Sequence, residues 1–257
     1  CRFFRCALQN DVGVGATKAK RVDANHQTAC GFKRLGFGDR LMIDIAGETR
    51  GVVPTENWKR NALGQSWFDG DTVQASIGQG YVLTTPLQLA TMTARIANGG
   101  KAVRPHLILP DLPYPAEDLG FKEEHLALVR RAMENVTNTQ EGTAYRYTKV
   151  DDPSLQIAGK TGTAQVARLS VGERLRMLDD VRTLDYNRRN HALFVGYGPL
   201  KKPRYACAVI VEHGDSGGRS AGPVVLDLLQ AAIVGNSGGR PNMINDRYNL
   251  VGRNDEV

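Results

Sequence analysis

The sequence is poor in cysteine, with four among 257 residues. They stand at positions 1, 6, 30 and 207, and no two have the Cys-x-x-Cys spacing of zinc-binding or redox pairs. Cys207 lies within the apolar run 205–211, where a small buried strand residue fits. We therefore expect neither a disulfide scaffold nor a metal site.

Long apolar runs are also lacking. No stretch reaches the ~18 uninterrupted apolar residues of a membrane span, and 23% of the residues are charged. The hydrophobic share of 41% excludes disordered and collagen-like classes and predicts one or two globular domains. The chain starts with Cys1-Arg-Phe-Phe4, without an initiating Met or a signal peptide, so we expect a piece of a longer protein.

The net charge is +6, and the basic excess lies in residues 1–40 and 168–204. Neither segment has the interleaved aromatics of an RNA-binding sheet or a helix-turn-helix pattern. A solvated basic surface is the simpler interpretation, and no nucleic-acid partner is expected.

Local signals predict where order begins. Residues 1–33 show no sustained period, and 36–71 is expected to be a glycine-punctuated loop region. A helix then opens with a capping box, formed by Thr85 and Gln88 with Pro86 at the first helical position. It should end at Asn98-Gly-Gly100, and its buried face repeats at spacings of three and four: Leu89, Met92 and Ile96.

A second helix is expected after a proline-rich connector at 105–115. Acidic residues in a first turn predict a start near Asp118, and the end should lie near Asn138. Its apolar residues again recur three and four apart: Leu126, Val129, Met133 and Val136.

The last hundred residues predict strands and a closing helix. Residues 155–166, 191–197 and 205–212 read as strands, with a polar surface excursion at 167–190. The closing helix should run from Pro223 to Gly235, with this apolar face: Val225, Leu228, Leu229 and Ala232. This order predicts an α+β fold in which an antiparallel sheet is flanked by helices. The tail 236–257 should be flexible.

Gly214-Asp-Ser-Gly-Gly218 matches the nucleophile signature of chymotrypsin-like proteases. That chemistry needs a His base, but only His26 lies far enough upstream, in the wrong context, and Arg219 replaces the usual Pro. The favoured interpretation is a strand-to-helix turn whose Asp215 and Ser216 help cap the helix. Two glycine pairs, 13–15 and 78–80, lack a full phosphate-binding pattern and are interpreted as turns.

The most informative segment is Lys160-Thr-Gly-Thr163, in the middle of a predicted strand. Glycine weakens strands unless something approaches the backbone closely. Lys160 can offer charge to a carboxylate and to a nearby nucleophile, while the hydroxyls of Thr161 and Thr163 bind that carboxylate and Gly162 leaves room. The N–H of Thr163 can face a developing oxyanion. A lysine that merely guards an edge strand would explain Lys160 but not the glycines.

This triplet resembles the third motif of penicillin-recognising serine enzymes, whose motifs are Ser-x-x-Lys, Ser-x-Asn or Ser-x-Asp, and Lys-Thr-Gly. From about Leu35 to about Val234 the chain is similar to class B penicillin-binding proteins, in particular the elongation type. The resemblance implies their penicillin-binding, serine β-lactamase-like transpeptidase fold. It is carried by these further segments: 43–48, 57–59, 78–89, 97–100, 105–106, 142–144 and 191–199.

One departure from the family is decisive for activity. No Ser is followed by Lys at the third position, so the chain holds no nucleophile motif, and no second motif follows Cys1-Arg-Phe-Phe4. We therefore expect a poorly matching segment at 1–34, the C-terminal part of a transpeptidase domain at 35–235, incomplete at its N-terminus, and a tail at 236–257.

The resemblance implies a peptidoglycan D,D-transpeptidase that needs no cofactor and no metal, with catalytic Lys160 and Thr163 and substrate-binding Thr161, Gly162 and Thr163. It implies stem peptides, β-lactams and elongation-complex membrane proteins as partners, and anchoring at the periplasmic face of the inner membrane. This chain alone should be inactive. The alternatives are a D,D-carboxypeptidase or β-lactamase of the same fold, and a non-catalytic remnant or binding domain.

Overall fold

The computed structural model describes residues 28–108, 116–166 and 185–235. The expected features at 1–27, most of the excursion at 167–190 and the tail from 236 lie outside these ranges. None of the helices in the described ranges combines the length and the apolar character needed to cross a membrane.

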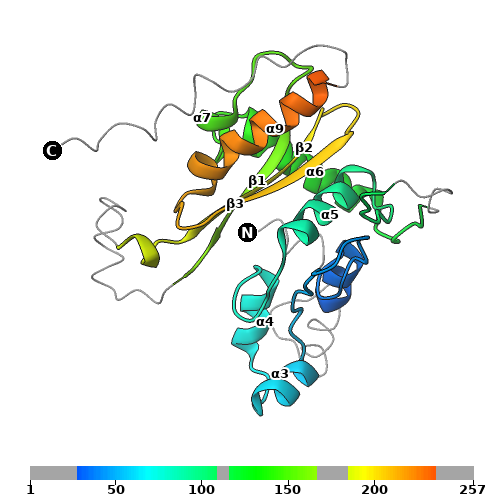
Figure 1. Cartoon of the computed structure of the whole chain (residues 1–257), viewed down its shortest axis with the longest axis vertical. Coiled ribbons are helices and arrows are strands. Elements are labelled where there is room, and N and C mark those ends of the chain that lie inside the picture. Colours follow the sequence, from blue (N-terminus) through cyan, green and yellow to red (C-terminus); the bar gives the residue numbers. More distant parts are fainter. Residues whose placement is uncertain (1–27, 109–115, 167–184, 236–257) are drawn as a thin grey trace.

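The centre of the fold is an antiparallel sheet of three strands in the order β1-β2-β3 (Figure 1). The strands are β1 (Ala158–Ala164), β2 (His191–Gly198) and β3 (Tyr205–Val211). All three predicted strands are confirmed, although β1 is shorter than expected at both ends. In register, Thr161 of β1 lies opposite Phe194 of β2.

Helices cover both faces of this sheet. On one face, α5 (Pro86–Ala97) packs on β2 and β3, and α6 (Glu123–Asn138) packs on β1. On the other face, α9 (Gly222–Gly235) packs on β2 and β3, with the short α7 (Tyr145–Thr148) beside it (Figure 1). This arrangement confirms the predicted α+β class.

The predicted capping box of α5 is present. The Thr85 hydroxyl accepts from the Gln88 N–H at 3.2 Å, and the Gln88 side-chain oxygen accepts from the Thr85 N–H at 3.2 Å. Met92 and Ile96 are buried, and Leu89 packs against them from the edge of the same core. The local sequence therefore predicted both where this helix starts and which of its faces is buried.

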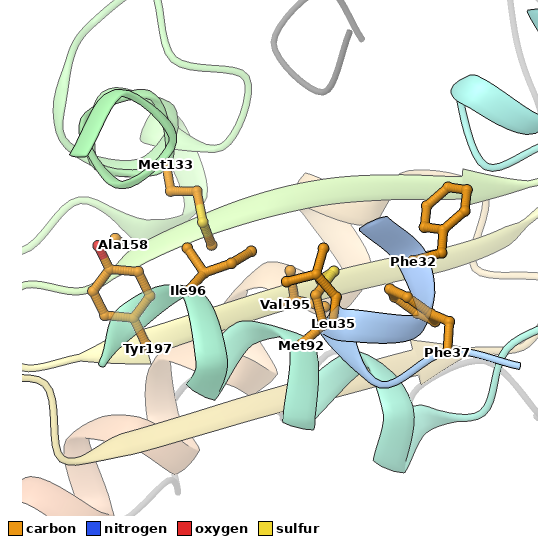
Figure 2. Packing of buried hydrophobic residues seen from close by; sticks show 9 residues of the cluster. All are labelled: Phe32, Leu35, Phe37, Met92, Ile96, Met133, Ala158, Val195 and Tyr197. Atoms are coloured by element: carbon orange, nitrogen blue, oxygen red, sulfur yellow. The ribbon is translucent and has the colours of Figure 1, made fainter. Parts of the chain in front are cut away.

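The core on the α5–α6 side also includes a helix over residues 28–35. Figure 2 shows Leu35 beside Met92 and Val195, with Phe32 and Phe37 at one end of the cluster and Tyr197 near Ile96 at the other end. The rings of Phe32 and Phe37 meet edge to face, with centroids 5.6 Å apart. The domain boundary expected at residue 35 falls in the last turn of this helix.

The second core lies between the sheet and α9, and β2 contributes Phe194 to it. Gly196 also faces α9, because a Cβ there would lie 2.9 Å from Val225. The prediction for Leu228 was wrong: it is 49% exposed, while Leu226 is fully buried. The buried stripe includes Gly222, Val225, Leu226 and Leu229, spaced as one helical face, and Leu228 falls off that face.

Two helices stand where a loop region was expected at 36–71: α3 (Glu56–Leu63) and the start of α4 (Asp69–Ser76). Thr55 caps α3 by accepting from the Trp58 N–H at 3.1 Å. Neither helix has a repeating apolar stripe. Their sequences therefore gave no helical period, and the local signals lay at the helix ends: the Thr55 cap and Gly64 for α3, and the acidic first turn of α4.

The start of α6 was also predicted too early. The helix begins at Glu123 rather than near Asp118. The Asp118 carboxylate accepts from the Gly120 N–H at 2.6 Å, and Gly120 has a positive φ of 67°. This local turn, together with an isolated bridge from Asp118 to Lys101, holds the chain out of the helix.

Candidate functional site

The Lys160-Thr-Gly-Thr163 segment lies on β1, at the edge of the described sheet. Ala158 belongs to the core on the α5–α6 side, and a Cβ on Gly159 would contact Phe194 of the other core. Because successive strand residues alternate between faces, Lys160 shares the face of Ala158 and Thr161 shares that of Gly159. Lys160 and Thr161 therefore start on opposite faces of β1. The Lys160 ammonium nevertheless reaches the Thr161 hydroxyl, so both groups are available at the edge of the strand.

Lys160 is half-buried and makes no ion pair with any residue in the described ranges. Its Nζ donates to the Thr161 carbonyl at 2.7 Å and to the Thr161 hydroxyl at 3.3 Å. Burial lowers the pKa of the Lys160 ammonium below its usual value of 10.5. Partial burial without a neutralising carboxylate favours the binding of an external anion.

Thr143 joins this site from the turn before α7. Its hydroxyl lies 3.3 Å from the Thr161 hydroxyl, and its side chain is exposed. The sequence placed Thr143 in a family-like segment but gave it no role. It is distant from Thr161 along the chain, and no local pattern could have paired the two hydroxyls.

The glycine-rich turn Gly214–Gly218 forms the wall behind the Lys-Thr-Gly segment. A Cβ on Gly217 would lie 2.6 Å from the Gly162 carbonyl oxygen, and one on Gly218 would lie 3.5 Å from the Thr161 methyl group. The close approach of the turn to β1 therefore requires glycine at position 217, whereas a Cβ on Gly218 would make an ordinary contact with Thr161.

Ser216 has the structural role predicted for it. Its hydroxyl accepts from the Arg219 N–H at 3.3 Å and caps the π-helical turn Gly217–Ala221 that leads into α9. This confirms the interpretation of the protease-like signature as a strand-to-helix turn. Asp215 has a positive φ of 63°, and its carboxylate lies 3.9 Å from the Arg219 guanidinium.

The Gly78-Gln-Gly80 turn reaches the other end of the Lys-Thr-Gly segment. Gln79 donates its side-chain N–H to the carbonyl of Thr163 at 3.4 Å. Both glycines have positive φ, near 73° and 72°, as a tight turn requires. The loop was predicted to be a turn, but its contact with β1 was not.

The described site suits a carboxylate ligand. An ammonium group and adjacent hydroxyls can form charge-assisted hydrogen bonds, which are stronger than neutral ones. Acyl transfer also needs a nucleophile and a base, and none of the serines in the sequence has the Ser-x-x-Lys context. The described residues therefore offer groups that can bind a carboxylate, but no serine in that context.

Comparison with known proteins agrees with this fold. The family model described as the penicillin binding protein transpeptidase domain matches residues 7–230. The chain belongs to this family. Within the family it is similar to proteins of the penicillin-binding protein 2 type, and the resemblance to class B penicillin-binding proteins is thus confirmed.

Two curated relatives are peptidoglycan D,D-transpeptidases named MrdA. The Acinetobacter baumannii protein is 36% identical over 200 residues, which cover 74% of this chain and 28% of the relative. The Salmonella typhimurium protein is 31% identical over 209 residues, covering 77% of this chain and 33% of the relative. This chain therefore spans about a third of the length of these relatives.

Solved structures show the same relationship. A complex between penicillin-binding protein PBP2 and MreC from Helicobacter pylori matches with a TM-score of 0.71 and 30% identity, covering 92% of this chain and 38% of that chain. Pseudomonas aeruginosa PBP2 in complex with WCK 5153 matches with a TM-score of 0.68 and 33% identity, covering 90% of this chain and 49% of that chain.

Proposed function

We propose that residues 35–235 form the C-terminal part of a serine D,D-transpeptidase domain and supply the carboxylate-binding side of its active site. The observation that carries this proposal is the half-buried Lys160 on an edge strand, with no acid paired to it among the described residues. The family of the chain agrees with this role.

Each residue of the motif receives a role in this proposal. Lys160 attracts the terminal carboxylate of a D-Ala-D-Ala stem peptide and stabilises a nearby serine alkoxide. The hydroxyls of Thr161 and Thr163 bind the carboxylate, and Gly162 leaves room for it. The Thr163 N–H helps to stabilise the oxyanion of the tetrahedral intermediate.

The reaction is acyl transfer in two steps. A serine from a segment outside these 257 residues attacks the carbonyl carbon of the penultimate D-Ala, so that its oxygen forms an ester while the bond to the terminal D-Ala nitrogen breaks. The serine proton passes to that amine, and D-Ala leaves. A neighbouring stem amine then attacks the ester, a peptide bond forms, and the serine regains a proton from the amine.

The proposed partners follow from this chemistry. Stem peptides and β-lactams would bind at the Lys-Thr-Gly strand. The intact protein would act at the periplasmic face of the inner membrane with membrane proteins of the elongation complex. The solved complex of a PBP2 with MreC supports such a partner.

Carboxylate binding can be tested on this chain without any nucleophile. Acetyl-D-Ala-D-Ala added to the ¹⁵N-labelled chain should shift the amide signals of residues 161–163, and the dipeptide amide, which lacks the carboxylate, should not. Lys160→Ala should abolish the shifts. Lys201→Ala, at an exposed turn between β2 and β3, should retain them. No binding by the unmodified chain would contradict the proposal and favour a remnant.

A further inference from the structure

Lys59 of α3 is buried, with only 2% of the residue exposed. Lysine is rarely buried this completely unless its charge is paired. Its Nζ donates to Asp71 of α4 at 2.7 Å, and the two side chains are 3% and 16% exposed. The ion pair therefore joins two short helices in a place that water barely reaches.

Aromatic rings surround this ion pair. The Lys59 ammonium lies 4.8 Å from the centre of the Phe68 ring and 5.5 Å from that of Tyr81. The Trp58 and Tyr81 rings lie 5.5 Å apart. Cation–π attraction and ring contact thus attach Tyr81 to α3. Tyr81 follows directly on the Gly78-Gln-Gly80 turn.

The same turn is also attached to α4. The Asp71 carboxylate accepts from the Phe68 N–H at 2.7 Å and fixes the first turn of that helix. At its other end, the carbonyl of Gln74 accepts from the Gln79 N–H at 2.9 Å. Gln79 is therefore placed between two anchored points, with its side chain 3.4 Å from the Thr163 carbonyl.

We propose that Lys59 and Asp71 are positioning residues, which hold Gln79 against Thr163 and thereby set the geometry of the Lys-Thr-Gly strand for its ligand. The proposal rests on the proposed function and deepens it. Removing one member of a buried ion pair leaves the other charge uncompensated. The helices then separate or rearrange, and the Gln79 turn loses its fixed position.

The first test needs no ligand. NMR should show that Lys59→Met shifts the Gln79 side-chain amide signals and the backbone amide of Ala164, whose peptide group contains the Thr163 carbonyl. Arg60→Met is a matched control, because Arg60 lies on the same helix and pairs with Glu56 at the same 2.7 Å distance, but in solvent. Asp71→Asn should act like Lys59→Met, and Lys59→Arg should restore the signals.

The second test measures affinity for acetyl-D-Ala-D-Ala. Lys59→Met should weaken binding by about tenfold, a coupling within the range seen for residues in one network. In a Gln79→Ala background it should have no further effect, because Lys59 acts through Gln79. Additive effects would overturn the proposal, as would unchanged Gln79 and Ala164 signals in Lys59→Met and Asp71→Asn.

The two tests separate this inference from the proposed function. If the unmodified chain does not bind the dipeptide, the proposed function fails. The ligand-free signals of Gln79 and Ala164 still report whether Lys59 positions the turn. If Lys59→Met does not fold, Asp71→Asn carries the test, because its amide oxygen can still accept from the Phe68 N–H while the charge is removed.

Discussion

Gly217 lies against the backbone of Gly162, closer than any side chain would permit. A Cβ on Gly217 would be 2.4 Å from the Leu193 carbonyl oxygen and 2.6 Å from that of Gly162. These are backbone atoms of two paired strands, which cannot move aside as a flexible side chain can. The turn before α9 therefore supports the binding strand directly.

Gly217→Ala should destabilise the fold and disturb the site. Overpacking against backbone is expected to cost about 1–3 kcal/mol, with shifted amide signals for Thr161 and Gly162. Urea denaturation measures the loss. Gly235→Ala is the control, because its Cβ would meet nothing within 4 Å. Equal urea midpoints for Gly217→Ala and Gly235→Ala would show that the turn can move to accommodate a Cβ and would contradict the prediction.

Lys160→Met should stabilise the free protein at neutral pH. Burial lowers the pKa of Lys160 in the folded state below 10.5, so near pH 7 the residue is charged in both states and the folded state carries the desolvation cost. Above the folded pKa the unfolded chain binds more protons, and the stability of the unmodified chain rises with pH. The extra free energy of unfolding of Lys160→Met over the unmodified chain should therefore decrease as pH approaches 10.5.

Urea denaturation between pH 7 and pH 11 measures this trend. Lys149→Met is the control, because it should destabilise the folded state at neutral pH where Lys160→Met stabilises it. The Asp151 carboxylate raises the pKa of Lys149. That ion pair stabilises the folded state below the unfolded pKa and is lost as pH rises. If the difference in free energy of unfolding between Lys160→Met and the unmodified chain stays constant or grows with pH, the assigned burial cost is contradicted.

The chain alone should form no covalent adduct with penicillin. Acylation needs a serine activated by a nearby base, and no Ser-x-x-Lys occurs in the sequence. Incubation with fluorescent penicillin, followed by denaturing electrophoresis, should leave the chain unlabelled while a full-length penicillin-binding protein 2 is labelled. A labelled band at the size of this chain would refute the prediction and identify a nucleophile that the motif search missed.

Thr137→Val should weaken the attachment of α6 to the start of β1. The buried Thr137 hydroxyl donates to the Ile157 carbonyl at 2.7 Å. The Asn138 amide also donates to this carbonyl, at 2.9 Å, so the oxygen keeps one partner. The loss of free energy of unfolding should be about 1 kcal/mol.

Thr139→Val provides the comparison for Thr137. Its hydroxyl donates to the Asn135 carbonyl at 2.8 Å but faces solvent, so the change should stay within about 0.5 kcal/mol. Thermal unfolding of both variants distinguishes them. A larger loss for Thr139→Val would show that the end of α6, rather than its contact with β1, limits stability.

The sequence predicted best what is determined locally. The Thr85 and Gln88 capping box defined α5, and strand patterns with a turn between them defined β2 and β3. Predictions failed where distant contacts decide. Whether Leu226 or Leu228 is buried depends on how α9 meets the sheet, and α3 is held by the Lys59–Asp71 ion pair rather than by its own apolar period.

The candidate site divides in the same way. The Lys160 motif could be recognised because its residues are contiguous. Thr143, Gln79 and Gly217 reach it from three other parts of the chain. Their positions follow from tertiary packing. No local periodicity at these residues predicts such contacts from a single sequence.

The central strand has a consequence for the order of folding. β2 is covered on one face by a core that includes Phe32, Leu35 and Phe37 and on the other by α9, so its two faces depend on widely separated segments. Closing such long loops costs chain entropy before any contact forms, and non-local contacts slow folding. During synthesis, the binding strand β1 cannot gain the support of Gly217 until the turn before α9 has left the ribosome.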